Sequence, residues 1–546
     1  MKIKKFVLSL IIFVLALFLL SFQAEKYQVG STYHGFRLTE KHFVEEVNAD
    51  CYYFEHLQSG ARLLKIAADD VNKTFCIAFK TTPETDCGTP HIMEHSVLNG
   101  SKNFPVKSPF DVLIKGSLNT FLNAMTGSDF TMYPVASMND KDYFNLMHVY
   151  LDAVLNPRIY DDPRIFRQEG WHYELKDMDT PIEYKGVVYN EMKGAFSSAT
   201  RELGYEIDKI LFPENCYGKS SGGYPPAIPE LSYEQFLDFH RKYYHPSNSY
   251  IYLYGDADLD KELSFINDTY LSHYKKSDDI ASISEQEPFK EMKEASGYYP
   301  VPEGSGTDNQ TYLSLSWVIG EGKDQNLCMA LDILSDALAN HESAPLRLAL
   351  QKAGIGREVR AFLSEQKQNV FQIRVQDANP SDTDTFKSIV MNTLTETVEK
   401  GLDKEMNEGI INRLEFRLRE GDTPQKGLVY LFQASSGWLY AGDPYLSLEW
   451  EKPLAKVKTA LDTDLLESII KKHLLDNPYA LLFTLEPKPG LENEKNEKIK
   501  EELAAYNESL SPEEKQELVA QTQELIDFQK REDSPEALAT IPRLEI

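Results

Sequence analysis

The chain has 546 residues, enough for two to four domains with buried cores. Hydrophobic residues make up 42% of it and charged residues 26%, which is ordinary for a soluble globular protein. Its formal net charge of −28 argues against nucleic acid as a partner and is compatible with basic peptides. Five cysteines without a C-x-x-C pair do not indicate a disulfide framework.

The first 24 residues are typical of a targeting segment. Three lysines precede an apolar run, residues 6–22, that only two serines interrupt. This run is near the lower length limit for a membrane span. We therefore predict export to the periplasm or the extracellular space. Residues 1–24 would be either a cleaved signal peptide or a retained N-terminal membrane anchor.

Short strands and helices alternate over residues 25–273, which predicts a mixed αβ domain. The apolar run 74–79 predicts a buried strand. A helix should follow at 89–99, because Thr89 is a good N-cap, Pro90 suits the first helical position and Asn99-Gly100 can end it. Residues 106–122 are less regular. Further patterns predict a strand at 130–134, a helix at 141–155, a helix from a Ser232/Gln235 capping box to Tyr243, and a strand at 250–254.

A charged stretch, 274–298, predicts a linker to a second αβ domain at 299–490. Its patterns predict strands at 311–318, 370–375 and 479–484, and a helix at 326–338. This order echoes the first domain without a second metal-binding motif, which predicts a repeated fold with one active copy. Residues 491–546 should form a helical hairpin, whose second helix opens with a Ser511/Glu514 capping box, and an extended tail from Ser534.

The five residues 91–95, H-I-M-E-H, carry the clearest chemistry. Residues four apart lie on one face of a helix, so His91 and His95 can bind one metal ion, and Glu94 can reach a water beside it. Two imidazole nitrogens and a nearby carboxylate make up a hydrolytic zinc site, and H-x-x-E-H is the inverted zincin motif. The alternative is a buried helix with two core histidines.

A third ligand must come from elsewhere in the chain. Glu191 lies beside an apolar stretch, where an unpaired carboxylate would be costly and a metal would remove that cost. Composition alone favours another interpretation, a helix-surface glutamate near Lys193. Cys87 is a weaker candidate, because the histidine pair already faces one side of its own helix.

Residues 89–98 resemble the zinc helix of the pitrilysin-type metallopeptidases, and the presequence protease branch is the most similar group. Supporting stretches are 120–126, 168–171, 185–194, 243–248 and 534–542. The resemblance implies an α+β fold of two homologous αβ domains, each a mixed β-sheet flanked by helices. It also implies that His91, His95 and Glu191 bind Zn²⁺ and that Glu94 is the general base.

Three further roles follow from the same resemblance. Asn123 and Ala124 would lie on an edge strand that pairs with the substrate backbone. Glu169, in the Q-E-G-W stretch, would support a metal ligand from behind. In the family, a second half closes over the first to form a chamber and supplies an Arg and a Tyr that help hold the substrate. No segment of this chain matches that half.

We therefore expect a zinc metalloendopeptidase that cleaves peptides and needs either a complementary C-terminal-half chain or a homodimer. Two alternatives remain at this point. The chain could be a catalytically incomplete peptide-binding or assembly subunit, or a truncated gene product.

Overall fold

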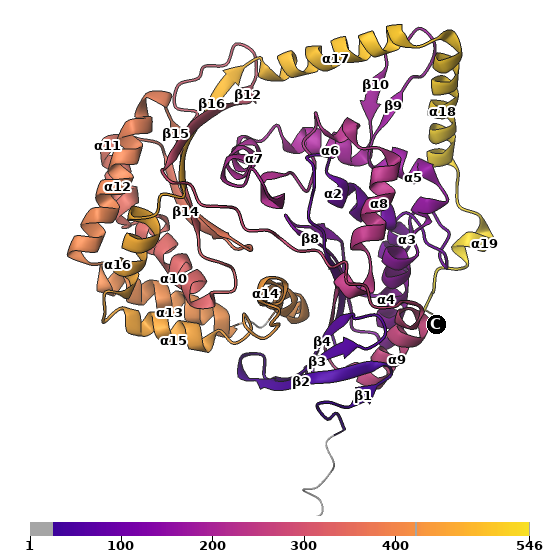
Figure 1. Ribbon diagram of the computed structural model, residues 1–546, viewed down its shortest axis with the longest axis horizontal. Helices are drawn as coiled ribbons and strands as arrows, with labels where there is room; N and C mark the ends of the chain where they lie inside the picture. The colour runs from indigo at the N-terminus through magenta and orange to yellow at the C-terminus, as the bar shows by residue number, and fades with distance from the viewer. Residues whose placement is uncertain (1–25, 421–422, 545–546) are drawn as a thin grey trace, which may run out of the picture.

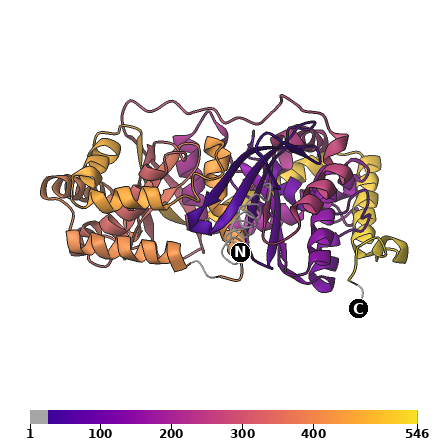
Figure 2. The same cartoon turned by 90° about the horizontal axis from the view of Figure 1, so that it is seen from below.

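The computed structural model describes residues 26–420 and 423–544. Two β-sheets, each covered by helices, lie side by side, and a long helical hairpin follows one flank of the molecule (Figures 1 and 2). This arrangement confirms the predicted α+β fold with mixed sheets. The division of the chain into domains at the predicted boundaries stays a prediction.

The first sheet has nine strands in the order β1-β2-β3-β4-β11-β5-β8-β6, with β7 paired to β8. Strand β11 runs parallel to β4 and antiparallel to β5, and β6 ends the sheet as an edge strand. The strands are β1 (Thr32–Tyr33), β2 (Phe36–Val44), β3 (Ala49–His56), β4 (Arg62–Ala67), β5 (Lys73–Lys80), β6 (Asn119–Leu122), β7 (Met125–Thr126), β8 (Phe130–Ser137) and β11 (Ser249–Tyr254).

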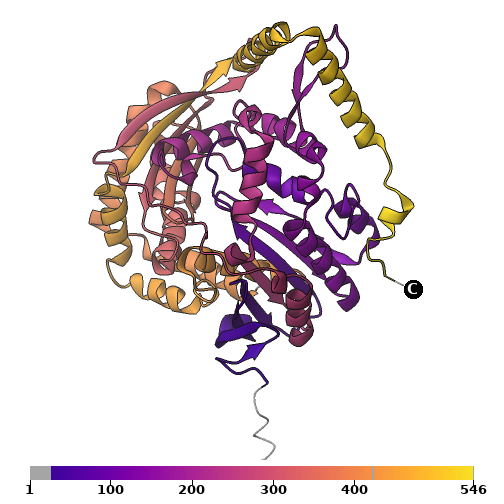
Figure 3. The ribbon, with the colours of Figure 1, turned by 45° about the vertical axis from the view of Figure 1, so that its right-hand side comes forward.

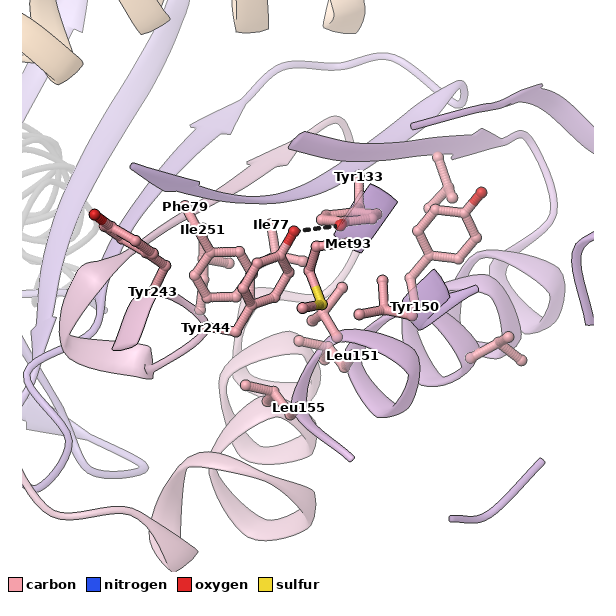
Figure 4. Packing of buried hydrophobic residues seen from close by; sticks show 14 of the residues in the cluster. Ile77, Phe79, Met93, Tyr133, Tyr150, Leu151, Leu155, Tyr243, Tyr244 and Ile251 are labelled. Atoms are coloured by element: carbon pink, nitrogen blue, oxygen red, sulfur yellow. Dashed lines mark hydrogen bonds between the residues drawn. The ribbon is translucent and has the colours of Figure 1, made fainter. Parts of the chain in front are cut away.

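Helices α2, α4 and α8 cover one face of this sheet in a single apolar cluster. Met93 of α2 is buried there, and Figure 4 shows it among Ile77 of β5, Tyr133 of β8 and Leu151 of α4. The helices of this part are α2 (Thr89–Val97), α3 (Pro109–Gly116), α4 (Asp140–Leu155), α5 (Pro163–Glu169), α6 (Val187–Ala195), α7 (Ala199–Leu211), α8 (Tyr233–Tyr243) and α9 (Leu259–Thr269).

The second sheet has five strands in the order β12-β16-β13-β15-β14. They are β12 (Lys293–Val301), β13 (Thr311–Ile319), β14 (Glu358–Ser364), β15 (Asn369–Ala378) and β16 (Ala480–Pro489). The accompanying helices are α10 (Gln325–Ser335), α11 (Pro345–Ala353), α12 (Thr383–Lys400), α13 (Lys404–Glu420), α14 (Lys426–Ala441), α15 (Glu451–Ala460) and α16 (Leu465–Ile470).

The two sheets share one strand topology. In the first, β4 pairs in parallel with β11, and β11, β5, β8 and β6 follow as antiparallel neighbours. In the second, β12 pairs in parallel with β16, and β16, β13, β15 and β14 follow in the same way. The chain visits the equivalent strands in the same sequence, which supports the predicted repeat.

Each sheet has one face covered by a helix from the other half of the chain. Leu431 and Trp438 of α14 pack on the first sheet against Cys76 and Tyr252. Conversely, Leu203, Ile207 and Leu211 of α7 pack on the second sheet in a shared apolar cluster. This exchange buries apolar surface of both sheets and holds them in a fixed relation.

The helical hairpin consists of α17 (Leu491–Ser509) and α18 (Pro512–Lys530), and Figure 3 shows it again from a second direction. It packs on a small separate ribbon formed by β9 (His172–Glu174) and β10 (Glu183–Lys185). Leu503 of α17 joins Leu175 and Ile182 in one apolar cluster, and the Leu175 amide donates to Thr522 Oγ1 of α18 at 3.0 Å.

Several local predictions need correction. Thr89 is the first helical residue and not the N-cap, because Gly88 takes that position with a left-handed φ of 69° that favours glycine. Residues 106–122 hold α3 and β6, the charged linker ends early because β12 begins at Lys293, and the tail contains α19 (Pro535–Leu538). The capping boxes at Ser232 and Ser511 are confirmed.

Candidate metal centre

Helices α2 and α6 bring three predicted ligands together. The Nε2 atoms of His91 and His95 lie 3.9 and 3.8 Å from Oε2 of Glu191. One ligand atom from each residue lies within 4.8 Å of the other two. Among the residues that the structure describes, this is the one group of three or more His, Cys, Asp and Glu side chains placed to bind a metal ion. Cys87, the weaker candidate, is buried and outside the group.

The second nitrogen of each imidazole has its own acceptor. His91 Nδ1 donates to the Gly222 carbonyl at 3.1 Å, and His95 Nδ1 donates to Glu169 Oε2 at 3.3 Å. A proton on Nδ1 leaves the lone pair of Nε2 free and directed at Glu191, as metal-binding histidines require. Glu169 is thus where its predicted supporting role needs it. Gly222 was not predicted, because a backbone carbonyl acceptor has no signature in the sequence.

A tight contact between two glycines positions the Gly222 carbonyl. Gly88, at the start of α2, lies so close to Gly223 that a Cβ added to Gly88 would be 2.5 Å from Gly223 Cα. Asp86 holds the loop from both sides, because its carboxylate accepts from the Ser220 amide at 2.8 Å and its carbonyl accepts from the Tyr224 amide at 2.7 Å.

The electrostatic surroundings of His95 suit a cation. Burial alone would lower the pKa of its imidazole, but the hydrogen bond to Glu169 and the charges of Glu94 and Glu191 outweigh burial and raise that pKa. Surroundings that stabilise an imidazolium also stabilise a bound divalent cation. Two nitrogens and one carboxylate oxygen are a donor set that Zn²⁺ uses in catalytic sites, so the residues present fit this metal.

Glu191 reaches the centre for a different reason from the one its sequence suggests. Its side chain is 53% exposed, so the cost of burying an unpaired carboxylate does not apply to it. Its place on α6, opposite α2, is what brings it to the histidines. Lys193, the alternative partner, contacts Asn496 instead.

Glu94 is buried, with 8% exposure, and Thr126 Oγ1 donates a hydrogen bond to its Oε2 at 2.6 Å. Thr126 lies on β7, opposite Thr131 of β8. This bond fixes one carboxylate oxygen and leaves Oε1 for another donor. Thr126 was not predicted, because nothing in the local pattern shows that β7 brings it to α2.

Asn123 and Ala124 lie between β6 and β7 and not within a strand, because the chain breaks its pairing there. The Asn123 amide donates to the Pro134 carbonyl of β8 at 3.3 Å. Both residues line one cavity with Glu94 and His95, so they do lie beside the candidate centre. Edge strand β6 leads directly to them.

Two family models match the chain. One is described as "Peptidase M16 inactive domain" and matches residues 230–414, and the other describes the region associated with subfamily C of the same peptidases and matches residues 485–546. "Protein HypA" of Clostridium perfringens is 44% identical over 95% of this chain and 54% of its own length. "Presequence protease 1, chloroplastic/mitochondrial" of Arabidopsis thaliana is 37% identical over 94% of this chain and 48% of its own length. The chain belongs to the M16 peptidase family. It spans about half the length of the curated relatives it matches.

Solved structures show the same fold. A protease from Helicobacter pylori has a TM-score of 0.62 at 16% identity and covers 79% of the M16 chain and 98% of its own. Pitrilysin has a TM-score of 0.55 at 16% identity and covers 83% of the M16 chain and 47% of its own. At such identities these likenesses show the fold alone.

The predicted export of the M16 chain is wrong. The relatives whose names state a compartment are mitochondrial, or chloroplastic and mitochondrial, presequence proteases, and nothing in the comparisons points to export. No helix among residues 26–420 and 423–544 is long and apolar enough to cross a membrane. The expected anchor, residues 6–22, lies outside the described residues.

Proposed function

We propose that the M16 chain is the catalytic half of a zinc-dependent metalloendopeptidase that hydrolyses peptides. The observation that carries this proposal is the convergence of His91, His95 and Glu191 within 4.8 Å, with each imidazole oriented through its second nitrogen. The names of the M16 relatives, which include several presequence proteases, support peptidase chemistry.

The Nε2 atoms of His91 and His95 and the carboxylate of Glu191 would hold the Zn²⁺. When bound, Zn²⁺ would act as a Lewis acid on the scissile carbonyl and lower the pKa of water, leaving a fourth position open as catalytic zinc sites do. Glu169 and the Gly222 carbonyl keep the two imidazoles in the orientation that this requires.

Glu94 would move the proton. Its carboxylate accepts a proton from the attacking water and returns it to the amine of the leaving peptide. Thr126 holds one of its oxygens, so the other is free for the water. Because Glu94 is 8% exposed, few bulk water molecules compete for this hydrogen bond.

The substrate would add to the sheet along β6, the outermost strand. An edge strand offers unpaired N–H and C=O groups to an extended peptide. A peptide paired there reaches Asn123 and Ala124, which line the same cavity as Glu94. Its backbone would then pass beside the proposed zinc centre.

We further propose that full activity requires a complementary half, supplied by another polypeptide or by a second copy of the M16 chain. The chain covers 54% of its Clostridium relative, and the family model at residues 230–414 is described as an inactive domain. The second sheet would therefore be non-catalytic. A competing function, a peptide-binding or assembly subunit without turnover, is favoured by the same partial coverage.

Zinc content and peptide cleavage test this proposal together. The purified chain should bind one Zn²⁺, and Glu94→Gln should keep the zinc while losing at least about 100-fold in kcat, on the order of a general-base contribution. Glu202→Gln is the matched control, because Glu202 is also buried but pairs with Lys495 at 3.4 Å. A chain without stoichiometric zinc overturns the proposal. Zinc-loaded chain that binds peptides but never cleaves them, with or without a complementary half, favours the assembly subunit.

A further inference from the structure

A cavity of about 350 Å³ opens directly beside Glu94. Glu94 and His95 contribute to one part of its wall, and Asn123 and Ala124 to another. The proposed general base and the end of the proposed substrate strand therefore border the same space. If the proposed function holds, a side chain next to the scissile bond must enter this cavity.

Part of the wall is apolar. Leu98, just after α2, and Phe110 of α3 line the cavity, and both are half-buried against the core of the first sheet. Apolar walls of this kind accommodate the methylene groups of a long side chain whose polar end remains near water.

The amide groups in the wall are engaged with one another. Gln168 Nε2 donates to Asn99 Oδ1 at 3.3 Å and to Glu169 Oε1 at 2.7 Å, and Asn99 Nδ2 donates to the His95 carbonyl at 3.0 Å. Glu169 in turn accepts from His95. This chain of hydrogen bonds supports His95 and leaves the Glu169 carboxylate committed.

Asp111 differs from these groups. It is the third residue of α3 and lines the cavity, and its backbone amide donates to Ser108 Oγ at 3.2 Å. Its carboxylate makes no hydrogen bond or ion pair with any residue in the described part of the chain. Lys115, four residues later, and Arg543, which lines a neighbouring cavity with Asp111, do not pair with it there either.

The position of Asp111 in the first turn of α3 has a structural explanation, because the positive end of the helix dipole favours a carboxylate there. That explanation accounts for the charge but leaves the carboxylate without a partner. No Lys or Arg is among the residues that line the cavity. A cationic side chain would therefore meet one uncommitted carboxylate and no repelling cation.

We infer that this cavity selects a Lys or Arg side chain on a peptide residue that flanks the scissile bond. Leu98 and Phe110 contact the methylene groups of that side chain, and Asp111 pairs with its charged end. Asp111 is thus a specificity-determining residue and not a catalytic one. The inference rests on the proposed function, and it gives local substance to the preference for basic peptides that the net charge of −28 only suggests.

Two fluorogenic peptides test it, identical except for Arg or Leu at the residue beside the cleaved bond, with the cut located by mass spectrometry. The zinc-loaded chain, with its complementary half where turnover needs one, should cleave the Arg peptide about three- to tenfold better in kcat/KM, the range of a partly exposed ion pair. Asp111→Asn should remove this preference without changing the Leu peptide, and Asp111→Lys should make a Glu peptide the better substrate.

Asp161→Asn is the matched control, because Asp161 is exposed, lies outside the cavity and changes the net charge equally. Equal cleavage of the two peptides, or an Arg preference that survives in Asp111→Asn, overturns this inference and leaves the proposed function standing. Binding of the same peptides to the zinc-loaded Glu94→Gln chain gives a second readout that needs no turnover, and there Asp111→Asn should erase the tighter binding of the Arg peptide. Failure to cleave any peptide counts against the proposed function instead.

Discussion

Replacing Thr126 with valine should impair catalysis without loss of zinc. Thr126 Oγ1 donates to Glu94 Oε2 at 2.6 Å, and valine has nearly the same shape without the donor. A hydrogen bond to a charged group contributes about 1.5–3 kcal/mol. Glu94 is 8% exposed, so water replaces the lost donor poorly. If about 1.5–2 kcal/mol of this orients the carboxylate for proton transfer, kcat should fall about 10- to 30-fold, at about 1.4 kcal/mol per factor of ten.

The assay is steady-state cleavage of a fluorogenic peptide by the zinc-loaded chain, with metal content measured on the same samples. Thr126→Ser keeps the hydroxyl and should keep most of kcat. Thr131→Val is the matched control, because Thr131 lies opposite Thr126 but bonds to Thr81 at 2.7 Å. KM should change little in any variant. Full kcat in Thr126→Val, or an equal loss in Thr131→Val, would refute the positioning of Glu94 by Thr126.

Two other predictions concern zinc affinity and acid stability. Glu169→Gln should weaken zinc binding about 10- to 100-fold in a chelator competition, whereas Glu174→Gln, whose carboxylate pairs with Lys176, should not; equal affinities would contradict the role of Glu169. Burial lowers the pKa of His240 to about 4, so the folded chain keeps it neutral while the unfolded chain protonates near pH 6.5. The unfolded state therefore binds more protons as pH falls from 6.5 to 4, and up to about 3 kcal/mol of stability should be lost there. Urea unfolding across this range should show a loss that His240→Gln reduces, and an unchanged pH dependence would count against it.

The sequence predicts best where the chemistry is local. His91 and His95 are four residues apart on one helix, so their proximity follows from helical geometry alone. Both capping boxes were likewise predictable, because they depend on residues three apart. Asn123 and Ala124 were assigned to a strand, but the break between β6 and β7 depends on pairing with β8, which lies further along the chain.

Contacts between distant segments were beyond sequence reasoning. The burial argument for Glu191 was wrong because its exposure depends on how α6 packs and not on the apolar residues beside it. Gly222 and Thr126 reach the centre from a loop and from β7, and each acts through a contact that has no local pattern. Only the resemblance to a family linked Glu169 to the histidines before their distance was known.

The repeated topology also explains why one half of this chain carries the centre. Helix α10 follows β13 as α2 follows β5, but it carries no histidine. Between β8 and α7 the first half inserts α5 and α6, which supply Glu169 and Glu191, whereas α12 and α13 stand between β15 and α14. The second half still contributes to the centre, because α7 follows α6 after a short turn and its apolar face packs on the second sheet. That packing anchors the helix that presents Glu191, so the half without metal ligands helps to position one of them.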